Sequence, residues 1–275
     1  MKNFKVGIQL YSVRDQMEND FYGTLKALKE AGYDYVEFAG YHDKSVTEIR
    51  AILDELGLEC ISSSIKCSTI LNQGEAVVNE LNTLGAKFCV LASASRGALA
   101  NSFDSLIENF KAAADILAEG GIKLAYHNHD FEFQTVNGEY VLDRIYACSD
   151  GKFSGELDTC WVHYAGVDPA AYMLKQKENV SLIHLKDFDC VNLAPGPLYD
   201  LVDEDPETDR KQKKINRGFK YTVLGQGRQD IASILSAAEE IGIEYVIYER
   251  DSSHDQNSVE AAIQSRKYLK DTFGI

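Results

Sequence analysis

The chain has 275 residues, of which 45% are hydrophobic and 26% charged, values typical of a globular protein with one sizeable core. Its net charge of −15 at pH 7 disfavours binding to nucleic acid, because an acidic surface repels the phosphate backbone. The sequence has no apolar run long enough to span a membrane, no recognisable export signal and only scattered cysteines, so we expect a cytoplasmic protein without a disulfide framework.

Eight short apolar runs, which we predict to be strands, alternate with amphipathic stretches along the chain. The runs are residues 5–10, 35–38, 59–64, 88–92, 122–127, 153–158, 181–186 and 245–250. The stretches between them have helical spacing, as in the stripe of Phe21, Leu25 and Leu28 that stops at Gly32. The same order of helix, glycine and strand recurs along the sequence, with connections as short as those of βα units.

Eight βα units predict a (β/α)8 TIM barrel, an α/β fold that forms a single domain over residues 1–275. The alternative is an open doubly wound sheet, but the first strand lacks the glycine-rich turn of that class. One stretch interrupts the repeat, an insertion at about 190–228 that holds three of the four prolines. A substrate lid and a disordered excursion are both open interpretations of it.

Polar residues gather where the last four predicted strands end. They are His127 and His129; Glu156 and Asp158; His184, Lys186 and Asp187; and Glu249, Arg250 and Asp251. In a barrel of this class the carboxyl ends of the strands form one rim, so these side chains are expected to converge on a shared cavity. Alternation along a strand places Glu156 with Asp158 on one face, and likewise His184 with Lys186.

Two imidazoles and two carboxylates at one point predict a site for one divalent cation, with Mn²⁺, Zn²⁺, Co²⁺, Fe²⁺ and Mg²⁺ as candidates. Each residue alone has a simpler explanation, because histidines at strand ends often form structural hydrogen bonds and aspartates often cap helices. Together they favour a metal, because burying His184, Asp158 and Glu249 without partners would cost several kcal/mol each.

The ordered motifs of the chain resemble the xylose isomerase-like TIM barrels, which include sugar phosphate isomerases and epimerases, inosose dehydratases and the related AP endonuclease family 2. The resemblance spans nearly the whole chain and rests on GIQLYSVR, GYDYVEFAG, YHNHDFEF, GELDTCWVHYAGVDP, SLIHLKD, LGQGRQDI and YVIYERD. It implies a metal-dependent enzyme that acts on a small sugar or polyol.

The resemblance also implies the metal ligands. Family members use an acid from strand five, an aspartate from strand six, a histidine from strand seven and a glutamate from strand eight, and the last three match Asp158, His184 and Glu249. At strand five His127 replaces the usual glutamate, and we expect it to be the fourth ligand, with Glu132 as the alternative. Trp161 replaces a histidine of the endonuclease metal cluster, which argues against DNA as a substrate.

The replacement of the strand-five glutamate by His127 also affects the expected catalytic residues. Related epimerases place one glutamate on each side of the substrate carbon, and only Glu249 of that pair is clearly present here. The base that removes a proton next to the carbonyl is therefore expected to be Glu249, His129 or Lys186, the last if burial beside a metal lowers its pKa. Otherwise Lys186 is expected to be a charge partner of Asp187 or Glu156. The loss of the second glutamate favours isomerisation or β-elimination over epimerisation.

Other polar or aromatic residues near the rim are candidates for binding the sugar through hydrogen bonds or an apolar platform. They are Gln9, Tyr11, Glu37, Ser62, Ser64, Glu132, Glu156, Trp161 and Arg250. The segment LGQGR, residues 224–228, raises the question of phosphate binding, but its signal is weak and an ordinary loop before a helix is the favoured interpretation.

The leading prediction is a divalent-metal-dependent sugar isomerase or epimerase that removes a proton beside the carbonyl of a keto-sugar or polyol. A lyase or dehydratase that eliminates water from an inosose or 3-keto-sugar is the first alternative. A barrel that binds sugar without turnover is the second. The expected partner is a small sugar or polyol, with neither nucleic acid nor membrane, and homo-oligomers are common among such barrels.

Overall fold

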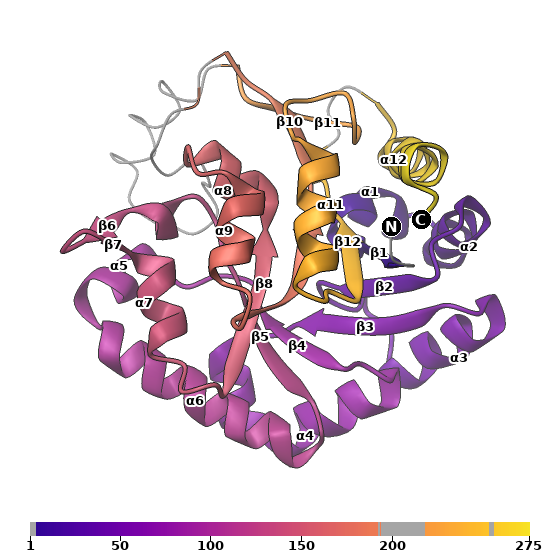
Figure 1. Ribbon diagram of the computed structural model, residues 1–275. Coiled ribbons are helices and arrows are strands. Elements are labelled where there is room, and N and C mark those ends of the chain that lie inside the picture. Colours follow the sequence, from indigo (N-terminus) through magenta and orange to yellow (C-terminus); the bar gives the residue numbers. More distant parts are fainter. Residues whose placement is uncertain (1–3, 192, 194–217, 253–255) are drawn as a thin grey trace.

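Eight parallel strands close into a barrel, and helices surround it (Figure 1). The computed structural model describes residues 4–191, 193, 218–252 and 256–275. The strands lie in the order β1-β12-β9-β8-β5-β4-β3-β2, and β2 pairs with β1 to close the ring. Their bounds are β1 Lys5–Gln9, β2 Tyr35–Phe38, β3 Glu59–Ser64, β4 Phe88–Leu91, β5 Lys123–His127, β8 Phe153–Asp158, β9 Val180–Leu185 and β12 Tyr245–Tyr248.

These strands coincide with the eight predicted apolar runs, and the predicted TIM barrel is confirmed. The open doubly wound sheet is wrong, because the first and last strands pair, with Lys5 opposite Tyr245. An open sheet leaves its edge strands unpaired on one side, whereas here every barrel strand has two parallel neighbours.

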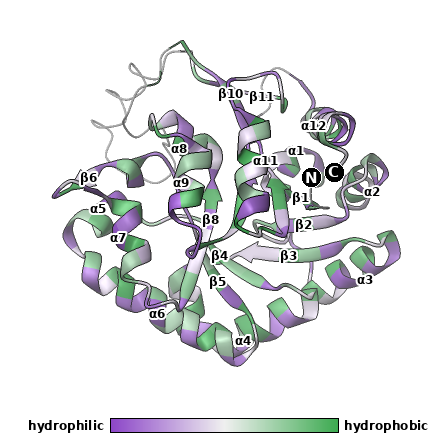
Figure 2. Cartoon of the chain, viewed as in Figure 1, coloured by the Kyte–Doolittle hydropathy of each residue, from purple (hydrophilic) through white to green (hydrophobic). Residues whose placement is uncertain are grey.

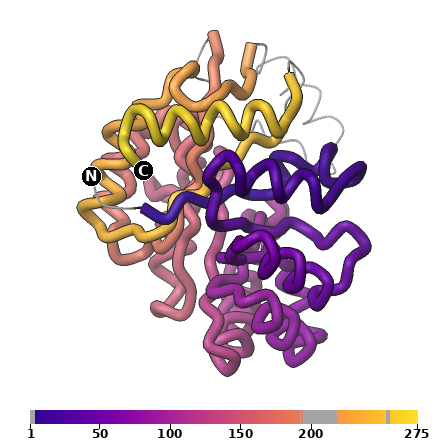
Figure 3. The backbone as a smooth tube through the Cα atoms, turned by 90° about the vertical axis from the view of Figure 1, so that its right-hand side faces the viewer, coloured from indigo at the N-terminus to yellow at the C-terminus, as the bar shows by residue number. Residues whose placement is uncertain are grey.

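The outer layer consists of helices that follow the strands. They are α1 Arg14–Met17, α2 Phe21–Ala31, α3 Val46–Leu56, α4 Cys67–Leu84, α5 Arg96–Asn101, α6 Phe103–Glu119, α7 Val141–Ala147, α8 Thr159–Tyr164, α9 Pro169–Lys175, α11 Ile231–Glu240 and α12 Ser258–Phe273. Short 3-10 turns lie at η1 Leu10–Val13 and η2 Phe131–Phe133. The last helix, α12, packs beside α2 and so completes the ring of helices (Figure 3).

The sequence sets the bounds of these helices through local capping. Helix α2 begins after Asp20, whose carboxylate accepts a backbone N–H of the first turn, and it ends at Gly32, which has a left-handed φ of 99°. The predicted stop at Gly32 is thus confirmed, and Phe21, Leu25 and Leu28 are buried as their spacing indicated. Hydrophobic and hydrophilic residues alternate along the outer helices, as Figure 2 shows.

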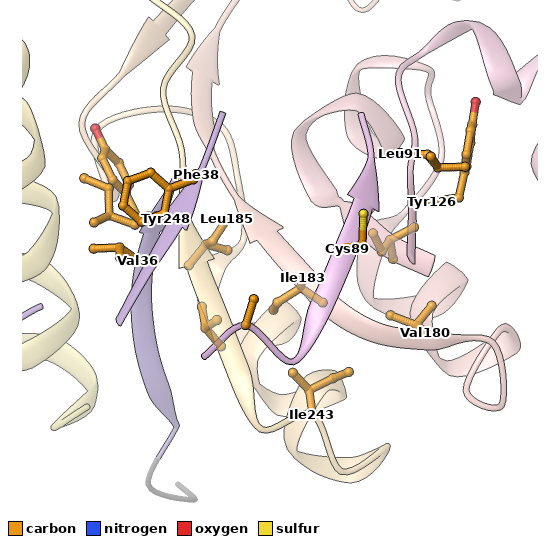
Figure 4. Close-up of a cluster of buried hydrophobic side chains, with 14 of the residues drawn as sticks. Val36, Phe38, Cys89, Leu91, Tyr126, Val180, Ile183, Leu185, Ile243 and Tyr248 are labelled. Atoms are coloured by element: carbon orange, nitrogen blue, oxygen red, sulfur yellow. The ribbon is translucent and has the colours of Figure 1, made fainter. Parts of the chain in front are cut away.

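Two apolar layers hold the barrel together, because side chains alternate along each strand between its inside and its outside. The inner layer contains Ile61, Phe88, Val90, Ala125, Leu182, Tyr245 and Ile247. Outward-facing neighbours such as Cys89, Leu91, Ile183 and Leu185 belong to the larger layer between the strands and the helices, part of which is drawn in Figure 4. This packing fixes which face of each strand points into the barrel.

Two small hairpins lie outside the barrel. One joins β6 Thr135–Val136 to β7 Glu139–Tyr140, and the other joins β10 Asp187–Asp189 to β11 Lys220–Thr222. Residues 192 and 194–217 of the predicted insertion, including its lysine-rich part at 211–214, lie outside the described residues, so the lid stays a prediction. Among the helices that the structure describes, none combines the length and the apolar character that a membrane crossing requires.

Candidate metal and substrate site

Polar side chains replace apolar ones where the barrel strands end. Apolar residues of β9 alternate between the inner and outer layers, and this alternation directs His184 into the barrel. In the strand register His127 of β5 lies opposite Glu156 of β8, and Asp158 of β8 lies opposite His184 of β9. Neighbouring strands therefore bring together groups that are far apart in the sequence.

The four predicted metal ligands form one cluster. His127, Asp158, His184 and Glu249 are all buried, and each offers a ligand atom within 4.8 Å of the others. Nε2 of His127 lies 3.5 Å from Oδ2 of Asp158, and Nδ1 of His184 lies 2.6 Å from Oε2 of Glu249. Two imidazoles and two carboxylates are a donor set that suits a divalent transition metal, so the residues present fit such an ion.

The backbone holds Asp158 in position for this role. Its Oδ1 atom accepts the N–H groups of Cys160 and Trp161 at 2.9 and 3.1 Å, and so caps helix α8. Its backbone N–H donates to the side-chain oxygen of Asn128, the residue between the two histidines of the HNH motif. Because Oδ1 is engaged, Oδ2 is the atom that faces His127 and the neighbouring lysine.

Glu37 and Glu156 form a second group of buried residues, which adjoins the first through His184. The Nε2 atom of His184 lies 3.1 Å from Oε1 of Glu37 and 3.2 Å from Oε2 of Glu156. Burial and the nearby charge of Glu37 raise the pKa of Glu156 well above its usual range, whereas His184 outweighs burial and lowers the pKa of Glu37. The pKa values of the two carboxyl groups move in opposite directions, because two closely spaced carboxyl groups disfavour a second negative charge.

Lys186 lies among three carboxylates. Its Nζ atom is 2.8 Å from Oδ2 of Asp158, 2.7 Å from Oε2 of Glu249 and 3.0 Å from Oδ1 of Asp251. Burial opposes its charge, but the carboxylates raise its pKa well above the usual value. Burial alone therefore does not lower the pKa of Lys186, because the negative charges around the side chain keep it an ammonium, and the lowering expected beside a bound metal stays a prediction. Its ion-pair partners are Asp158, Glu249 and Asp251, which corrects the expected pairing with Asp187 or Glu156.

These side chains border a cavity of about 210 Å³ at the carboxyl end of the barrel. It is lined by Gln9, Tyr11, Glu37, Ala39, Ser64, Val90, Ala92, His127, His129, Glu156, His184, Lys186, Glu249 and Asp251. The predicted substrate contacts Gln9, Tyr11, Glu37, Ser64 and Glu156 are among them, and the cavity has room for one small molecule.

Four predicted substrate contacts lie outside this lining. Ser62 donates its hydroxyl to Glu37, and the guanidinium of Arg250 donates to the carbonyl of Tyr221 at 3.0 Å. The ring of Trp161 stacks on Phe219, with 5.8 Å between centroids, and lies 5.5 Å from the Lys186 ammonium. These residues support the cavity wall, because their polar and aromatic groups are used in packing against it.

Glu132, the alternative strand-five ligand, lies outside the metal cluster. Its carboxyl group accepts the hydroxyl of Tyr126 at 2.5 Å and the backbone N–H of His129 at 2.9 Å. Tyr126 faces outward from β5, so Glu132 points toward the helices and fixes the turn that carries His129. Burial raises the pKa of Glu132 to about 8.

The partners of two rim aspartates, Asp187 and Asp251, were not predicted from the sequence. Asp251 contacts Lys186 and accepts the hydroxyl of Tyr221 from the hairpin strand β11. Asp187 does not face the cavity but binds the loop before α11. The rim position of both was visible in the sequence, but their partners lie about 30 to 65 residues away and gave no local signal.

A family model described as xylose isomerase-like TIM barrel matches residues 25–272 of the chain. Among curated relatives the chain is similar to the inosose dehydratase of Clostridium beijerinckii, with 23% identity over 288 residues that cover 94% of this chain and 91% of the relative. The resemblance seen in the sequence motifs is thereby confirmed.

Solved structures show the same fold. A sugar phosphate isomerase/epimerase from Parabacteroides distasonis superposes with a TM-score of 0.79 and 21% identity, covering 99% of this chain and 96% of that one. The IolI protein with a binding zinc atom superposes with a TM-score of 0.73 and 18% identity, covering 98% of this chain and 97% of that one. At these identities the likeness establishes the barrel, and the chemistry has to be argued from the site.

Proposed function

The chain belongs to the xylose isomerase-like TIM barrel family, and on this premise we propose that it is a metal-dependent carbohydrate dehydratase. The reaction removes water from a keto-polyol or keto-sugar by β-elimination. The observation that carries the proposal is the pairing of a four-ligand cluster, three of whose members line one cavity, with a buried ammonium, Lys186, on the wall of the same cavity. The similarity to an inosose dehydratase over most of both chains supports it.

One divalent ion held by His127, Asp158, His184 and Glu249 would polarise the substrate carbonyl and make the neighbouring C–H bond acidic. The zinc described for the similar IolI barrel supports an ion of this kind. The ligands reach the site from four barrel strands or their ends, which is the usual origin of catalytic groups in this fold.

His129 acts as the base in this proposal. It lines the cavity, and its ring stacks on Phe131 with 5.5 Å between centroids. Burial, assisted by the charge of Lys186, lowers the pKa of His129 well below its usual value, so the imidazole is neutral and able to accept a proton. Glu249 is less suited, because its carboxylate is engaged by His184 and Lys186.

Lys186 acts as the acid. A base removes the proton from the carbon beside the carbonyl, the electrons of that C–H bond form the new double bond, and the β-hydroxyl group leaves. Lys186 donates a proton to this group, which departs as water, and the proton held by His129 returns to Lys186 through solvent. An ammonium fixed by Asp158, Glu249 and Asp251 is already oriented toward the cavity.

The sugar isomerase predicted from the sequence shares the first step and differs in the second. An isomerase returns the proton to the neighbouring carbon and leaves the number of oxygen atoms unchanged. The cavity accommodates either reaction, so the products separate them.

The test is proton NMR in D₂O with the metal-loaded protein and a panel of inososes, 3-keto-sugars, aldoses and ketoses. A dehydratase gives a product that has lost one water and shows either a vinylic proton or, where the enol formed first tautomerises to a diketone, a deuterated deoxy carbon. Deuterium in a product that keeps all its oxygens indicates an isomerase, and no change with any member of the panel indicates a sugar-binding barrel without turnover.

Two variants test the assigned roles. His129→Gln should abolish hydrogen–deuterium exchange at the carbon beside the carbonyl, whereas Lys186→Met should retain exchange but lose water elimination. His42→Asn is the control, because His42 lies outside the cavity lining and has a φ of 49° that asparagine tolerates. Loss of exchange in the lysine variant but not in the histidine variant would reverse the assignment.

A further inference from the structure

The loop that follows the seventh barrel strand surrounds a carboxylate of the same chain. Oδ1 of Asp187 accepts the N–H groups of Phe188 and Gln229 at 2.9 and 3.1 Å. Oδ2 accepts those of Gly225 and Gly227, both at 2.9 Å. Four backbone donors converging on two oxygens form the kind of concave arrangement that binds anions in proteins.

The position of this loop in the barrel is one at which many enzymes of this fold bind phosphate. TIM barrel enzymes frequently bind phosphate groups with the loops after strands seven and eight and a helix N-terminus next to them. Here the loop leads directly into α11, and the N-terminus of that helix is capped by Asp230, which accepts the N–H of Ser233 at 3.0 Å. Asp187 therefore occupies the loop and Asp230 occupies the helix N-terminus, the two places where a phosphate group would otherwise bind.

The glycines of LGQGR serve this internal contact. A Cβ atom on Gly227 would lie 2.2 Å from Oδ1 of Asp187 and 2.4 Å from the carbonyl oxygen of Phe188, distances that no real side chain adopts. Gly225 has a φ of 80°, which favours glycine. The loop thus requires glycine in order to close around Asp187, not to admit a ligand.

We propose that Asp187 permanently occupies the anion-binding loop of the barrel, and that the substrate is in consequence an uncharged carbohydrate without a phosphate or carboxylate group. This inference rests on the proposed function, since it selects one substrate class for the same cavity.

The charge of the cavity supports the same conclusion independently. Glu37, Glu156, Glu249 and Asp251 line it, and Lys186 is the one lysine or arginine that the described residues contribute to its lining. Four acidic residues thus face the cavity against one ammonium, so its wall has no surplus positive charge for an anion. A phosphate or carboxylate on the substrate would therefore be repelled.

The nearby arginines are engaged elsewhere. Arg14 donates to the carbonyl oxygens of Tyr11 and Asp251 at 2.6 and 3.0 Å, and its guanidinium lies 3.7 Å from the centre of the Tyr11 ring. Arg228, within LGQGR itself, donates to the carbonyl of Cys190 at 2.8 Å. Their guanidinium groups hold backbone carbonyls at the rim and do not line the cavity.

The first experiment removes the internal anion. Asp187→Ala leaves four inward N–H groups without an acceptor, so the variant should melt at a lower temperature than the wild type. Inorganic phosphate at millimolar concentration should restore much of that loss in a saturable way, because it takes the place of the carboxylate. Chloride at equal ionic strength should not.

Asp230→Ala is the matched control, because it also removes a carboxylate that accepts a backbone N–H beside α11 but leaves no group of four donors. Phosphate should shift its melting temperature, and that of the wild type, only by the small unsaturable amount that an excluded salt produces. Equal saturable shifts in all three proteins, or none in Asp187→Ala, would overturn the proposal. If Asp187→Ala folds only when phosphate is present during purification, the proposal is supported.

The second experiment needs no variant. Binding of myo-inositol and of myo-inositol 1-phosphate to the metal-loaded wild type is measured by calorimetry, together with glucose and glucose 6-phosphate. In each pair the phosphorylated member should bind roughly tenfold more weakly or worse. Equal or tighter binding of a phosphorylated member would overturn the inference. Failure of the proposed function looks different: no substrate is converted, while the phosphate rescue of Asp187→Ala persists.

Discussion

Replacement of Lys186 by methionine tests the electrostatic organisation of the site. The lysine side chain is 2% exposed, and its Nζ atom lies within 3.0 Å of one oxygen from each of Asp158, Glu249 and Asp251. Methionine has a similar length, so the change removes the charge with little loss of packing. Removing one partner of a buried ion pair costs about 3–5 kcal/mol, because the remaining charge is left without compensation.

We expect the lower end of this range, about 3 kcal/mol at pH 8 in the presence of a chelator. Two of the carboxylates keep other donors, since Asp158 caps α8 and Asp251 accepts the Tyr221 hydroxyl. The loss should be smaller at pH 5. Burial has already raised the pKa of Asp251 to about 6, and removal of the ammonium raises it further. A carboxyl group whose folded pKa is raised stabilises the fold at low pH and loses that contribution as pH rises through the folded value.

The assay is urea unfolding of wild type and variant at both pH values, with metal removed. Lys111→Met is the matched control, because Lys111 also contacts two carboxylates, those of Glu108 and Asp150, but at the surface. Solvent screens such pairs, so the control should change stability little at either pH. A Lys186→Met variant within about 1 kcal/mol of the wild type at pH 8, or one equally destabilised at both pH values, would refute the reasoning.

Three further outcomes are expected. Asp158→Asn keeps the cap of α8 but loses a charged ligand, so metal content by elemental analysis should fall to background, whereas Asp168→Asn at the cap of α9 should bind metal as the wild type does. Chelation of the metal should lower the melting temperature, and each tested ion should restore it in proportion to its affinity, which an unchanged melting curve would contradict. Burial raises the pKa of Glu132 to about 8, so this group lowers the free energy of unfolding by about 1.4 kcal/mol per pH unit between its unfolded pKa and pH 8. Glu132→Gln should flatten this slope in unfolding experiments. An unaltered slope would show that Glu132 is not buried as described.

The barrel and its inward-facing residues were predictable because both depend on short-range patterns. Strand alternation placed Glu156 with Asp158 on the inner face, and the order of βα units placed His184 and Glu249 at the same rim. The strand ends gave the candidates for the four-residue cluster, and the family resemblance selected Asp158, His184 and Glu249 from among them.

Contacts across the barrel were not predictable in this way. Glu37 on β2 and Glu156 on β8 meet at His184 although their strands are not neighbours in the ring. Sequence position gives the rim on which each residue lies but not the direction of its side chain across the cavity. Glu132 illustrates the same limit, since a carboxylate near a strand end turned out to bind Tyr126 on the outer face.

The backbone determines where two acidic groups of the rim lie, those of Asp158 and Asp187. Oδ1 of Asp158 is held by the first turn of α8, and both oxygens of Asp187 are held by the loop before α11. Hydrogen bonds from main-chain N–H groups need no side-chain ordering, so these carboxylates are fixed when the barrel folds and before any ligand arrives. Asp158 then offers its second oxygen to His127 and Lys186, whereas Asp187 has none left to offer. The same type of contact therefore builds a cation site from Asp158 and removes an anion site through Asp187.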